Sequence, residues 1–248
     1  MEAFDLTGRV AVVTGGGQGI GEGIATSLAT AGAKVVVAAR SRDRIERVAS
    51  DIEQAGSSAI AVPTDVTDRS ALVALADAAV SEYGRLDVWV NNAGGSPVRS
   101  PLGELSDDDW DACLALNLTA VWRASVVAAE RMAEGGSINI SSPAGDRGVP
   151  GSGHYAAAKA GVNSLTRTLS LELAPSVRVN GISPGYVPTQ VMMTALDTDE
   201  DALEAMAEKR IPLARLGTPV DMGSTAVYLA SAAGSWVTGQ TIIVAGGL

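Results

Sequence analysis

Short runs of β-branched and other apolar residues alternate along this chain with longer segments of helical periodicity. Seven such runs predict strands, at residues 10–14, 34–38, 59–62, 86–90, 137–140, 177–182 and 241–244. The first five are almost entirely apolar, which is typical of strands covered by helices on both faces of a parallel sheet. The pattern therefore predicts an α/β fold in which a doubly wound, seven-stranded parallel sheet lies between two layers of helices.

Three of the segments between strands carry helix start signals, in which a side-chain oxygen can cap the first turn. They are Thr67-Asp68, Ser106 followed by three aspartates, and Thr218-Pro219-Val220-Asp221. No linker or change of composition divides the chain, so we expect a single domain over residues 1–248. The longest interruption of the pattern, residues 185–212, is predicted to be a substrate lid, and a surface helical hairpin is the alternative.

Composition and charge narrow the classes of function. The 28 acidic and 18 basic residues give a net charge of −10, which disfavours nucleic acid as a partner. A single Cys (Cys113) and a single His (His154) exclude a disulfide framework and a Cys/His metal site, so we expect no bound metal and a cytoplasmic protein. The first residues do not resemble a signal peptide, and the charge-free stretch 222–248 is interrupted by polar residues and glycines. We therefore expect no membrane association.

A glycine-rich turn, Thr14-Gly15-Gly16-Gly17-Gln18-Gly19-Ile20-Gly21, follows the first predicted strand and leads into a helix predicted for residues 20–31. Glycines let a backbone turn tightly and approach a pyrophosphate, and a helix N-terminus offers unpaired N–H donors. A turn without a ligand is the alternative. The residues expected to bind the phosphates of a dinucleotide here are Gly15, Gly17, Gln18, Gly19 and Ile20.

The second predicted strand ends in Ala38-Ala39-Arg40, without the Asp or Glu that accepts from the ribose 2′-hydroxyl in many NAD-binding folds. An arginine at this point can pair with a 2′-phosphate. The sequence therefore favours NADP(H) over NAD(H) as the cofactor, and a helix-capping role for Arg40 is the alternative.

Tyr155 and Lys159 are four residues apart at the start of a predicted alanine-rich helix, so both side chains lie on one face. A nearby ammonium favours the phenolate and can lower a tyrosine pKa from about 10 toward the working pH. Tyr155 is therefore a candidate general acid/base, although the spacing by itself is weak evidence.

Polar residues follow two further predicted strands. Ser142 comes after strand 137–140, and Asn91-Asn92-Ala93-Gly94 comes at the end of strand 86–90. The carboxyl ends of parallel strands are where α/β sheets bind ligands, so Ser142 can donate to a substrate oxygen. Asn117 lies in the otherwise apolar stretch 114–121 and needs a hydrogen-bond partner.

Together these motifs resemble the short-chain dehydrogenase/reductase family, in its single-domain branch. The resemblance covers nearly the whole chain and implies a Rossmann-type fold and hydride transfer to or from a nicotinamide cofactor. It rests on motifs in the family's order and spacing, namely Thr14-Gly15 with Gly19 and Gly21, Asp65, Asn91-Asn92-Ala93-Gly94, Asn117, Ser142, Tyr155 with Lys159, Asn180, and Pro184-Gly185.

The resemblance also implies residue roles. Tyr155 would be the general acid in reduction and the general base in oxidation, with Ser142 orienting the carbonyl or hydroxyl oxygen. Lys159 would lower the pKa of Tyr155 and hold the nicotinamide ribose, and Asn117 would keep a water for proton relay. The cofactor contacts expected beyond the glycine turn are Arg40, Asp65, Val66, Asn91, Ala93, Gly94, Tyr155, Lys159, Pro184, Gly185, Val187 and Thr189.

The expected activity is NADP(H)-dependent hydride transfer between the nicotinamide and a ketone or secondary alcohol, which is a small-molecule substrate. One alternative is a 3-oxoacyl-[acyl-carrier-protein] reductase, for which Arg123, Arg131 and Arg167 would form a local basic patch. A second alternative is a dinucleotide-sensing protein without catalysis, which would be expected to lose the catalytic residues that this chain keeps.

Substrate contacts and assembly are the least defined expectations. For His154, a capping or loop role is the alternative to a substrate contact. The resemblance implies a homo-oligomer, either a tetramer or a dimer, built on predicted helices 107–132 and 155–174. The residues expected to contact the substrate are Pro143, His154, Tyr186, Met192 and Met193.

Overall fold

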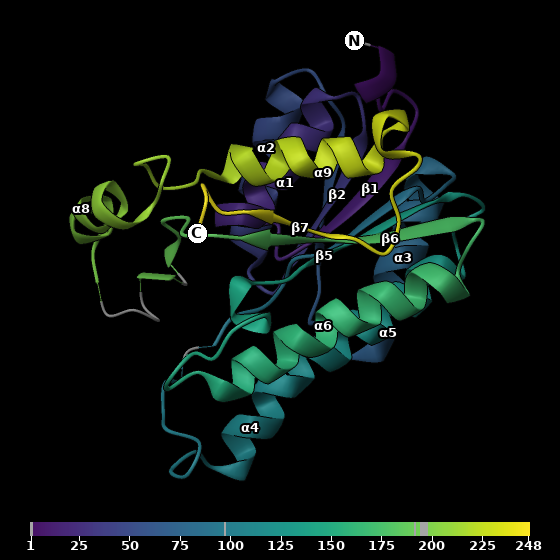
Figure 1. Ribbon diagram of the computed structural model, residues 1–248. Coiled ribbons are helices and arrows are strands. Elements are labelled where there is room, and N and C mark those ends of the chain that lie inside the picture. The colour runs from purple at the N-terminus through teal and green to yellow at the C-terminus, as the bar shows by residue number, and fades with distance from the viewer. Residues whose placement is uncertain (1, 97, 191, 194–197) are drawn as a thin grey trace.

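The apolar runs of the sequence pair with one another as neighbouring strands. In the residues that the computed structural model describes, 2–96, 98–190, 192–193 and 198–248, seven strands form one parallel sheet in the order β3-β2-β1-β4-β5-β6-β7 (Figure 1). The predicted fold class is thereby confirmed. The strands are β1 (Val10–Thr14), β2 (Lys34–Ala39), β3 (Ala59–Pro63), β4 (Val88–Asn91), β5 (Gly135–Ile140), β6 (Val177–Pro184) and β7 (Thr241–Val244).

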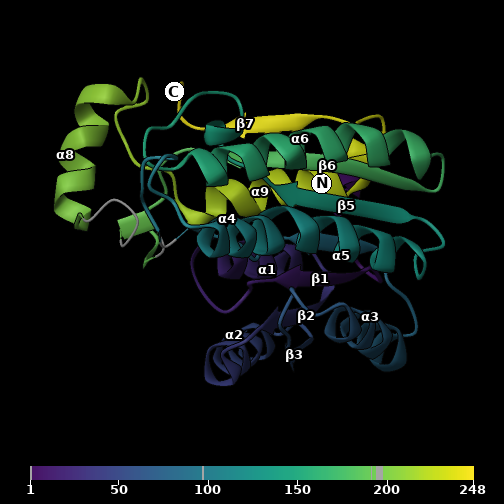
Figure 2. The ribbon, with the colours of Figure 1, turned by 90° about the horizontal axis from the view of Figure 1, so that it is seen from below.

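Helices cover both faces of the sheet (Figures 1 and 2). In β2, Val35 and Val37 belong to the core beneath α1, α2 and α9, whereas Val36 and Ala38 belong to the core on the other face, with α3, α5 and α6. Because both faces are buried, the strand must be apolar throughout. The helices are α1 (Gly19–Thr30), α2 (Arg42–Gln54) and α9 (Pro219–Ala230) on one face, and α3 (Arg69–Tyr83), α5 (Ala120–Ala129) and α6 (Gly153–Glu172) on the other.

The order of the strands reverses between β1 and β4. The chain leaves β1 toward α1 on one face, and it leaves β4 toward α4 (Asp107–Leu114) and α5 on the opposite face. Ligands of open α/β sheets bind at such a switch point, outside the carboxyl ends of the strands. The glycine-rich turn and the Asn91 to Gly94 segment both start there.

The helix predicted for residues 107–132 contains an irregular turn. α4 and α5 are joined by the π-helical turn η2 (Ala115–Thr119), and α5 ends at Ala129. Of the described helices, this combined helix is long and apolar enough to cross a membrane. Because Ala120, Val121 and Ala124 are buried in the core, we interpret its apolar composition as that of a core helix.

The three predicted helix starts are confirmed. Asp68 caps α3 by accepting from the Ser70 amide, and Ser106 caps α4 by accepting from the Asp109 amide. Thr218 and Asp221 form a reciprocal capping box at the start of α9. These caps satisfy backbone N–H groups that a helix leaves without intrahelical partners.

The long segment between β6 and α9 contains α8 (Glu200–Arg210), which buries Leu203 and Ala207 and lies near the C-terminus (Figure 1). Residues 191 and 194–197 of the predicted lid are outside the described residues. The role of residues 185–212 as a lid stays a prediction.

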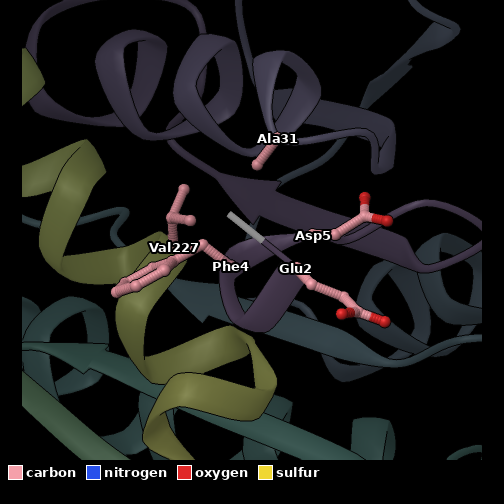
Figure 3. Close-up of a pocket in the computed structure, with 5 residues that line it drawn as sticks. All are labelled: Glu2, Phe4, Asp5, Ala31 and Val227. Carbon is pink, nitrogen blue, oxygen red and sulfur yellow. The ribbon is translucent and has the colours of Figure 1, made fainter.

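A surface hollow of about 470 Å³ lies beside the N-terminal segment (Figure 3). It is lined by Glu2, Phe4 and Asp5 before β1, by Ala31 at the end of α1, and by Val227 of α9. These residues lie toward the amino ends of the strands, whereas the candidate ligand-binding residues follow their carboxyl ends. We therefore do not assign the hollow to the candidate site.

Asp87 joins the amino ends of β1 and β4. Its side chain is only 3% exposed, and it accepts hydrogen bonds from Arg9 Nη1 at 2.8 Å, Arg85 Nε at 2.8 Å and the Val10 amide at 2.9 Å. Burial raises the pKa of Asp87, but the hydrogen bonds from Arg85, Arg9 and Val10 outweigh burial and leave the pKa below its ordinary value of 3.8. The folded chain therefore favours the ionised carboxylate.

We predict that Asp87→Asn lowers the free energy of unfolding by about 2 kcal/mol at neutral pH, because hydrogen bonds to a charged group are lost. A folded-state pKa below the unfolded value stabilises the protein above the unfolded pKa, and this contribution disappears as the pH falls through the folded-state pKa. Urea unfolding at neutral and acidic pH measures the difference, which should shrink in acid. Asp77→Asn, at a carboxylate that is 60% exposed, is the control and should change stability little.

Candidate active site

The turn after β1 has room for backbone but not for side chains. Gly15 and Gly19 have positive φ angles of 66° and 57°. A Cβ on Gly21 would lie 2.2 Å from the Gly15 carbonyl oxygen and 2.4 Å from Asn92 Nδ2. The turn therefore presents its backbone at the N-terminus of α1, where Gln18 supplies no side-chain cap. This arrangement fits the pyrophosphate of a dinucleotide, because unpaired N–H groups at a helix start bind anions.

Thr14 and Asn92 fasten the glycine-rich turn to the end of β4. Asn92 Nδ2 donates to the carbonyl oxygens of Thr14 at 2.9 Å and Gly15 at 3.1 Å. The Thr14 hydroxyl donates to the Val90 carbonyl oxygen at 3.0 Å and accepts from the Ala93 amide at 3.2 Å. The two loops at the switch point are thus fixed to each other by side-chain to backbone hydrogen bonds.

Asn91 is directed into the protein rather than toward a ligand. Its amide accepts from Trp89 Nε1 at 2.9 Å and donates to Ser125 Oγ and Asn139 Oδ1, each at 2.9 Å. Its side chain is 4% exposed. The side-chain amide is therefore engaged in the core, and the cofactor contact predicted for Asn91 stays a prediction. Val66 and Ala93, which were also expected to contact the cofactor, line a small cavity of about 10 Å³ together with Thr14.

Arginines of the β2–α2 region surround the glycine-rich turn. Arg44 donates to the Gln18 side-chain oxygen. Arg47 forms salt bridges with Glu22 at 2.8 Å and Asp51 at 2.9 Å. Arg40 is exposed after β2 and forms no salt bridge with another described residue.

Asp65, predicted at the adenine end, lies near enough to Arg40 for the two charges to interact. Its Oδ1 accepts from the Thr67 amide at 2.9 Å and from the Thr67 hydroxyl at 2.7 Å. These hydrogen bonds are the main cause that lowers the pKa of Asp65, and the charge of Arg40 lowers it further. The structure therefore brings Arg40 and Asp65, from the ends of neighbouring strands, into one polar region.

Tyr155 and Lys159 project from the first turns of α6, as their spacing predicted. Lys159 is 4% exposed, its Nζ donates to the Ile140 carbonyl oxygen at 2.7 Å, and Nζ lies 5.5 Å from the centroid of the Tyr155 ring. Burial lowers the pKa of Lys159 to about 8. Burial also raises the pKa of Tyr155 to about 12, and a hydrogen bond with the Ser142 side chain opposes that rise. The lowered tyrosine pKa expected from the sequence is thus not produced by these protein groups.

Ser142 lies between β5 and the short helix η3 (Pro143–Gly145). Its hydroxyl accepts from the Ala144 amide at 3.2 Å, and Pro143 occupies the first turn of η3. The same hydroxyl interacts with Tyr155, so the structure brings together the two groups predicted to act on one substrate oxygen. η3 packs closely on α6, because a Cβ on Gly145 would lie 2.9 Å from the Ala160 amide nitrogen.

Asn117 lies in the π-helical turn η2 and is fully buried. Its Nδ2 donates to the Gly95 carbonyl oxygen at 2.9 Å and to the Cys113 carbonyl oxygen at 3.0 Å, while its Oδ1 accepts from the Gly95 amide at 2.9 Å. The partner that its apolar surroundings required is therefore the backbone of the loop after β4. In this arrangement the amide of Asn117 positions that loop.

The segment after β6 folds back over the glycine-rich turn. The Thr189 methyl group lies 3.0 Å from the position of a Cβ on Gly19, and the Thr189 hydroxyl accepts from the Met192 amide at 3.2 Å. Val187 is fully buried, whereas Tyr186 and Met192 are half-buried. The structure thus brings predicted cofactor and substrate residues of this segment to the same edge as the turn.

The surroundings of His154 differ from those expected for a substrate contact. The imidazole is 1% exposed, and its Nε2 lies 2.9 Å from the Ser96 hydroxyl. The residue is the second of α6, so its side chain is covered where the loop after β4 packs against that helix. We therefore assign it to the wall of the site rather than to a surface that touches substrate.

Comparison with known proteins connects this geometry to a family. A family model described as enoyl-(acyl carrier protein) reductase matches residues 15–248. An uncharacterised oxidoreductase of Mycobacterium tuberculosis is 42% identical over 252 residues, covering 100% of this chain and 95% of that protein. The cis-4-hydroxycyclohexanecarboxylate dehydrogenase of Sinomonas cyclohexanicum is 40% identical over 245 residues, covering 96% of each.

A solved structure extends the likeness to three dimensions. It is a 7α-hydroxysteroid dehydrogenase complexed with NADH and 7-oxo glycochenodeoxycholic acid, with a TM-score of 0.92, 35% identity, and coverage of 99% of this chain and 96% of that one. The chain belongs to the short-chain dehydrogenase/reductase family. This confirms the resemblance seen in the sequence and identifies the protein as an oxidoreductase of a family that binds nicotinamide dinucleotides.

Several residues that build this short-chain dehydrogenase/reductase site were missed as site residues in the sequence. Thr14 and Asn92 were noted only as motif members, and their position directly at strand ends was the available signal. The Ser141 hydroxyl donates to Asn163 Oδ1 at 2.5 Å, and Asn163 Nδ2 donates to Asp146 at 3.1 Å. These bonds fix the loop after η3 to α6, and only the folded chain shows them.

We predict that Gly21→Ala weakens dinucleotide binding and lowers the free energy of unfolding by about 1–3 kcal/mol, because the added Cβ overlaps the Gly15 carbonyl and displaces Asn92. Thermal unfolding and fluorescence titration with NADPH and NADH measure the two effects. Gly103→Ala is the matched control, since a Cβ there meets open space. Unchanged dinucleotide affinity in Gly21→Ala would remove the turn from the binding site.

Proposed function

We propose that this short-chain dehydrogenase/reductase transfers a hydride between NADP(H) and a ketone or secondary alcohol, with Tyr155 as the general acid/base. The observation that carries the proposal is the contact between the side chains of Ser142 and Tyr155, beside the buried ammonium of Lys159. A hydroxyl donor, a phenol and a cation within one site are the groups that a carbonyl oxygen needs as it gains negative charge.

In the direction of reduction, a bound nicotinamide would supply the hydride for the carbonyl carbon. Ser142 donates a hydrogen bond to the carbonyl oxygen, and Tyr155 delivers the proton that turns this oxygen into a hydroxyl group. Because the pKa of Tyr155 is raised to about 12, the protonated donor predominates at neutral pH. Lys159, with a pKa lowered to about 8, is charged below that pH and stabilises the phenolate that remains.

Binding of the dinucleotide is proposed to use the two halves of the switch point. The glycine-rich turn would hold the pyrophosphate, and Asp65 and Val66 would border the adenine. Gly94 and the segment from Pro184 to Thr189 would border the nicotinamide. Asn117 acts in this scheme by fixing Gly95, because both ends of its amide are already bonded to protein groups.

We infer a ring ketone or ring alcohol as the substrate class. Two of the three relatives described above carry ring compounds in their descriptions: one is a cis-4-hydroxycyclohexanecarboxylate dehydrogenase, and the other is a 7α-hydroxysteroid dehydrogenase complexed with 7-oxo glycochenodeoxycholic acid. The acyl-carrier-protein alternative receives no added support, since Arg131 is paired with Asp77 and Glu130, and Arg123 donates to the Thr67 carbonyl oxygen. The arginines noted for a carrier-protein patch are therefore partly engaged elsewhere.

A homo-oligomer and a cytoplasmic location remain part of the proposal. The helices expected to form the subunit contact expose Leu171 at 80% and Trp122 at 44%. A contiguous apolar patch built from such side chains would mark a surface that another subunit covers. The size of the assembly stays a prediction.

We predict that Arg40 makes the site prefer NADPH. Arg40→Asp should raise the Kd for NADPH by about 10- to 100-fold, as expected when charge-assisted hydrogen bonds to a phosphate are lost, and should change the Kd for NADH little. Fluorescence titration with each dinucleotide measures both constants, and Arg167→Asp on the outer face of α6 is the charge control. A wild-type preference for NADH would assign Arg40 another role.

We predict that Tyr155→Phe lowers kcat by at least about 100-fold, because the proton donor is removed while the ring is kept. A 7-oxo bile acid and 4-oxocyclohexanecarboxylate are the first ketones to test, with oxidation of NADPH followed by absorbance. NADPH affinity should stay near the wild-type value. Tyr83→Phe is the control, since the Tyr83 hydroxyl contacts Ser58 at 3.2 Å and has no role in the proposed mechanism. Full activity in Tyr155→Phe would disprove this mechanism.

A further inference from the structure

His154 is buried directly before the proposed acid/base and is unused by the proposed mechanism. Its Nε2 lies 2.9 Å from Ser96 Oγ. Its Nδ1 is buried and has no hydrogen-bond partner among the described residues. One nitrogen of this buried imidazole is hydrogen-bonded and the other is not, so the ring proton has a preferred nitrogen. The hydrogen bonds of the neighbouring Ser96 hydroxyl indicate which nitrogen carries it.

Counting hydrogens assigns the tautomer. The Ser96 hydroxyl has a single proton, and it donates that proton to the Val98 carbonyl oxygen at 3.1 Å. With that proton directed to Val98, Ser96 Oγ can accept from His154 only through an Nε2–H group, which leaves the lone pair of the ring on Nδ1.

The residue held by His154 belongs to a loop that touches the catalytic groups. Ser96 follows Gly95, whose amide and carbonyl are both bonded to Asn117 at 2.9 Å. Gly94 lies so close that a Cβ there would be 2.8 Å from Asn117 Oδ1 and 3.6 Å from Lys159 Nζ. Two buried side chains, one from η2 and one from α6, thus hold adjacent residues of the loop after β4.

We propose that His154 is a positioning residue, which through its Nε2–H bond to Ser96 fixes residues 94–96 against the helix that carries Tyr155 and Lys159. Asn117 bonds to this loop at one residue, Gly95. The bond from His154 to Ser96 adds a second point of attachment one residue further on, and the two points together set the direction of the loop after Gly95. The effect on turnover rests on the proposed function, whereas the hydrogen bond and its effect on the loop do not.

The first experiment uses the fact that His154 is the only histidine in the chain. Protein labelled with ¹⁵N-histidine gives a long-range ¹H–¹⁵N spectrum of this one imidazole. We expect a protonated Nε2 and an unprotonated Nδ1 in the wild type, with averaging of the two nitrogens in Ser96→Ala. Ser100→Ala, which removes a hydroxyl that donates to the Pro101 carbonyl, is the control from the same loop. A proton on Nδ1, or averaging in the wild type, would overturn the proposal.

The second experiment tests the position of the bond. Glutamine can place its amide nitrogen near the site of Nε2, whereas the shorter asparagine reaches only the site of Nδ1. His154→Gln should keep the slow amide hydrogen exchange of Gly95 and most of the wild-type kcat for reduction of a ring ketone. His154→Asn should lose the exchange protection and lower kcat by about 10- to 100-fold.

The outcomes separate the two proposals. If the wild type reduces no ketone, the proposed function fails, while the imidazole spectrum and the exchange of Gly95 still decide whether His154 holds the loop. If His154→Gln and His154→Asn behave alike, with thermal unfolding that shows both to be folded, His154 fills space and does not position the loop. A double variant of His154→Asn and Ser96→Ala should be no worse than either single variant, because both remove the same bond.

Discussion

The site depends on asparagine amides that satisfy backbone groups where the strands end. Loops leaving a parallel sheet expose N–H and C=O groups that must find partners when they are buried. Asn92 does this for Thr14 and Gly15, and Asn117 does it for Gly95. A side-chain amide carries both a donor and an acceptor, so one asparagine can bond to both the backbone N–H and the backbone C=O of one residue. The glycine-rich turn and the loop after β4 keep their shapes for this reason.

Burial shifts the pKa values of the two central ionisable groups in opposite directions. It raises the pKa of Tyr155 to about 12 and lowers that of Lys159 to about 8, so each group is moved toward its neutral form. The Ile140 carbonyl holds the Lys159 ammonium at 2.7 Å and compensates part of the cost of burying it. A protonated phenol beside such a cation is suited to giving a proton to a carbonyl oxygen.

The sequence was sufficient for features that depend on local pattern. Strands buried on both faces leave uninterrupted apolar runs, and the spacing of Tyr155 and Lys159 places them on one helix face wherever the helix lies. The π-helical turn η2 could not be predicted, because it forms where Asn117 meets Gly95, a residue distant in sequence. The inward direction of Asn91 follows from its pairing with Asn139 in the sheet, and strand register is a property of the assembled fold. The burial of His154 likewise depends on the loop that covers it.

The C-terminal residues fix both ends of the predicted lid. The Gly185 amide donates to the Val244 carbonyl oxygen at 2.9 Å, and a Cβ on Gly185 would lie 2.7 Å from the Ala245 Cα. At the other end, the Leu213 amide donates to the Gly246 carbonyl oxygen at 3.1 Å. The start and the end of the segment are therefore attached to the same short stretch after β7. Any rearrangement of this segment that admits a substrate must take place between these two points of attachment. The residues after β7 therefore help to position the candidate site.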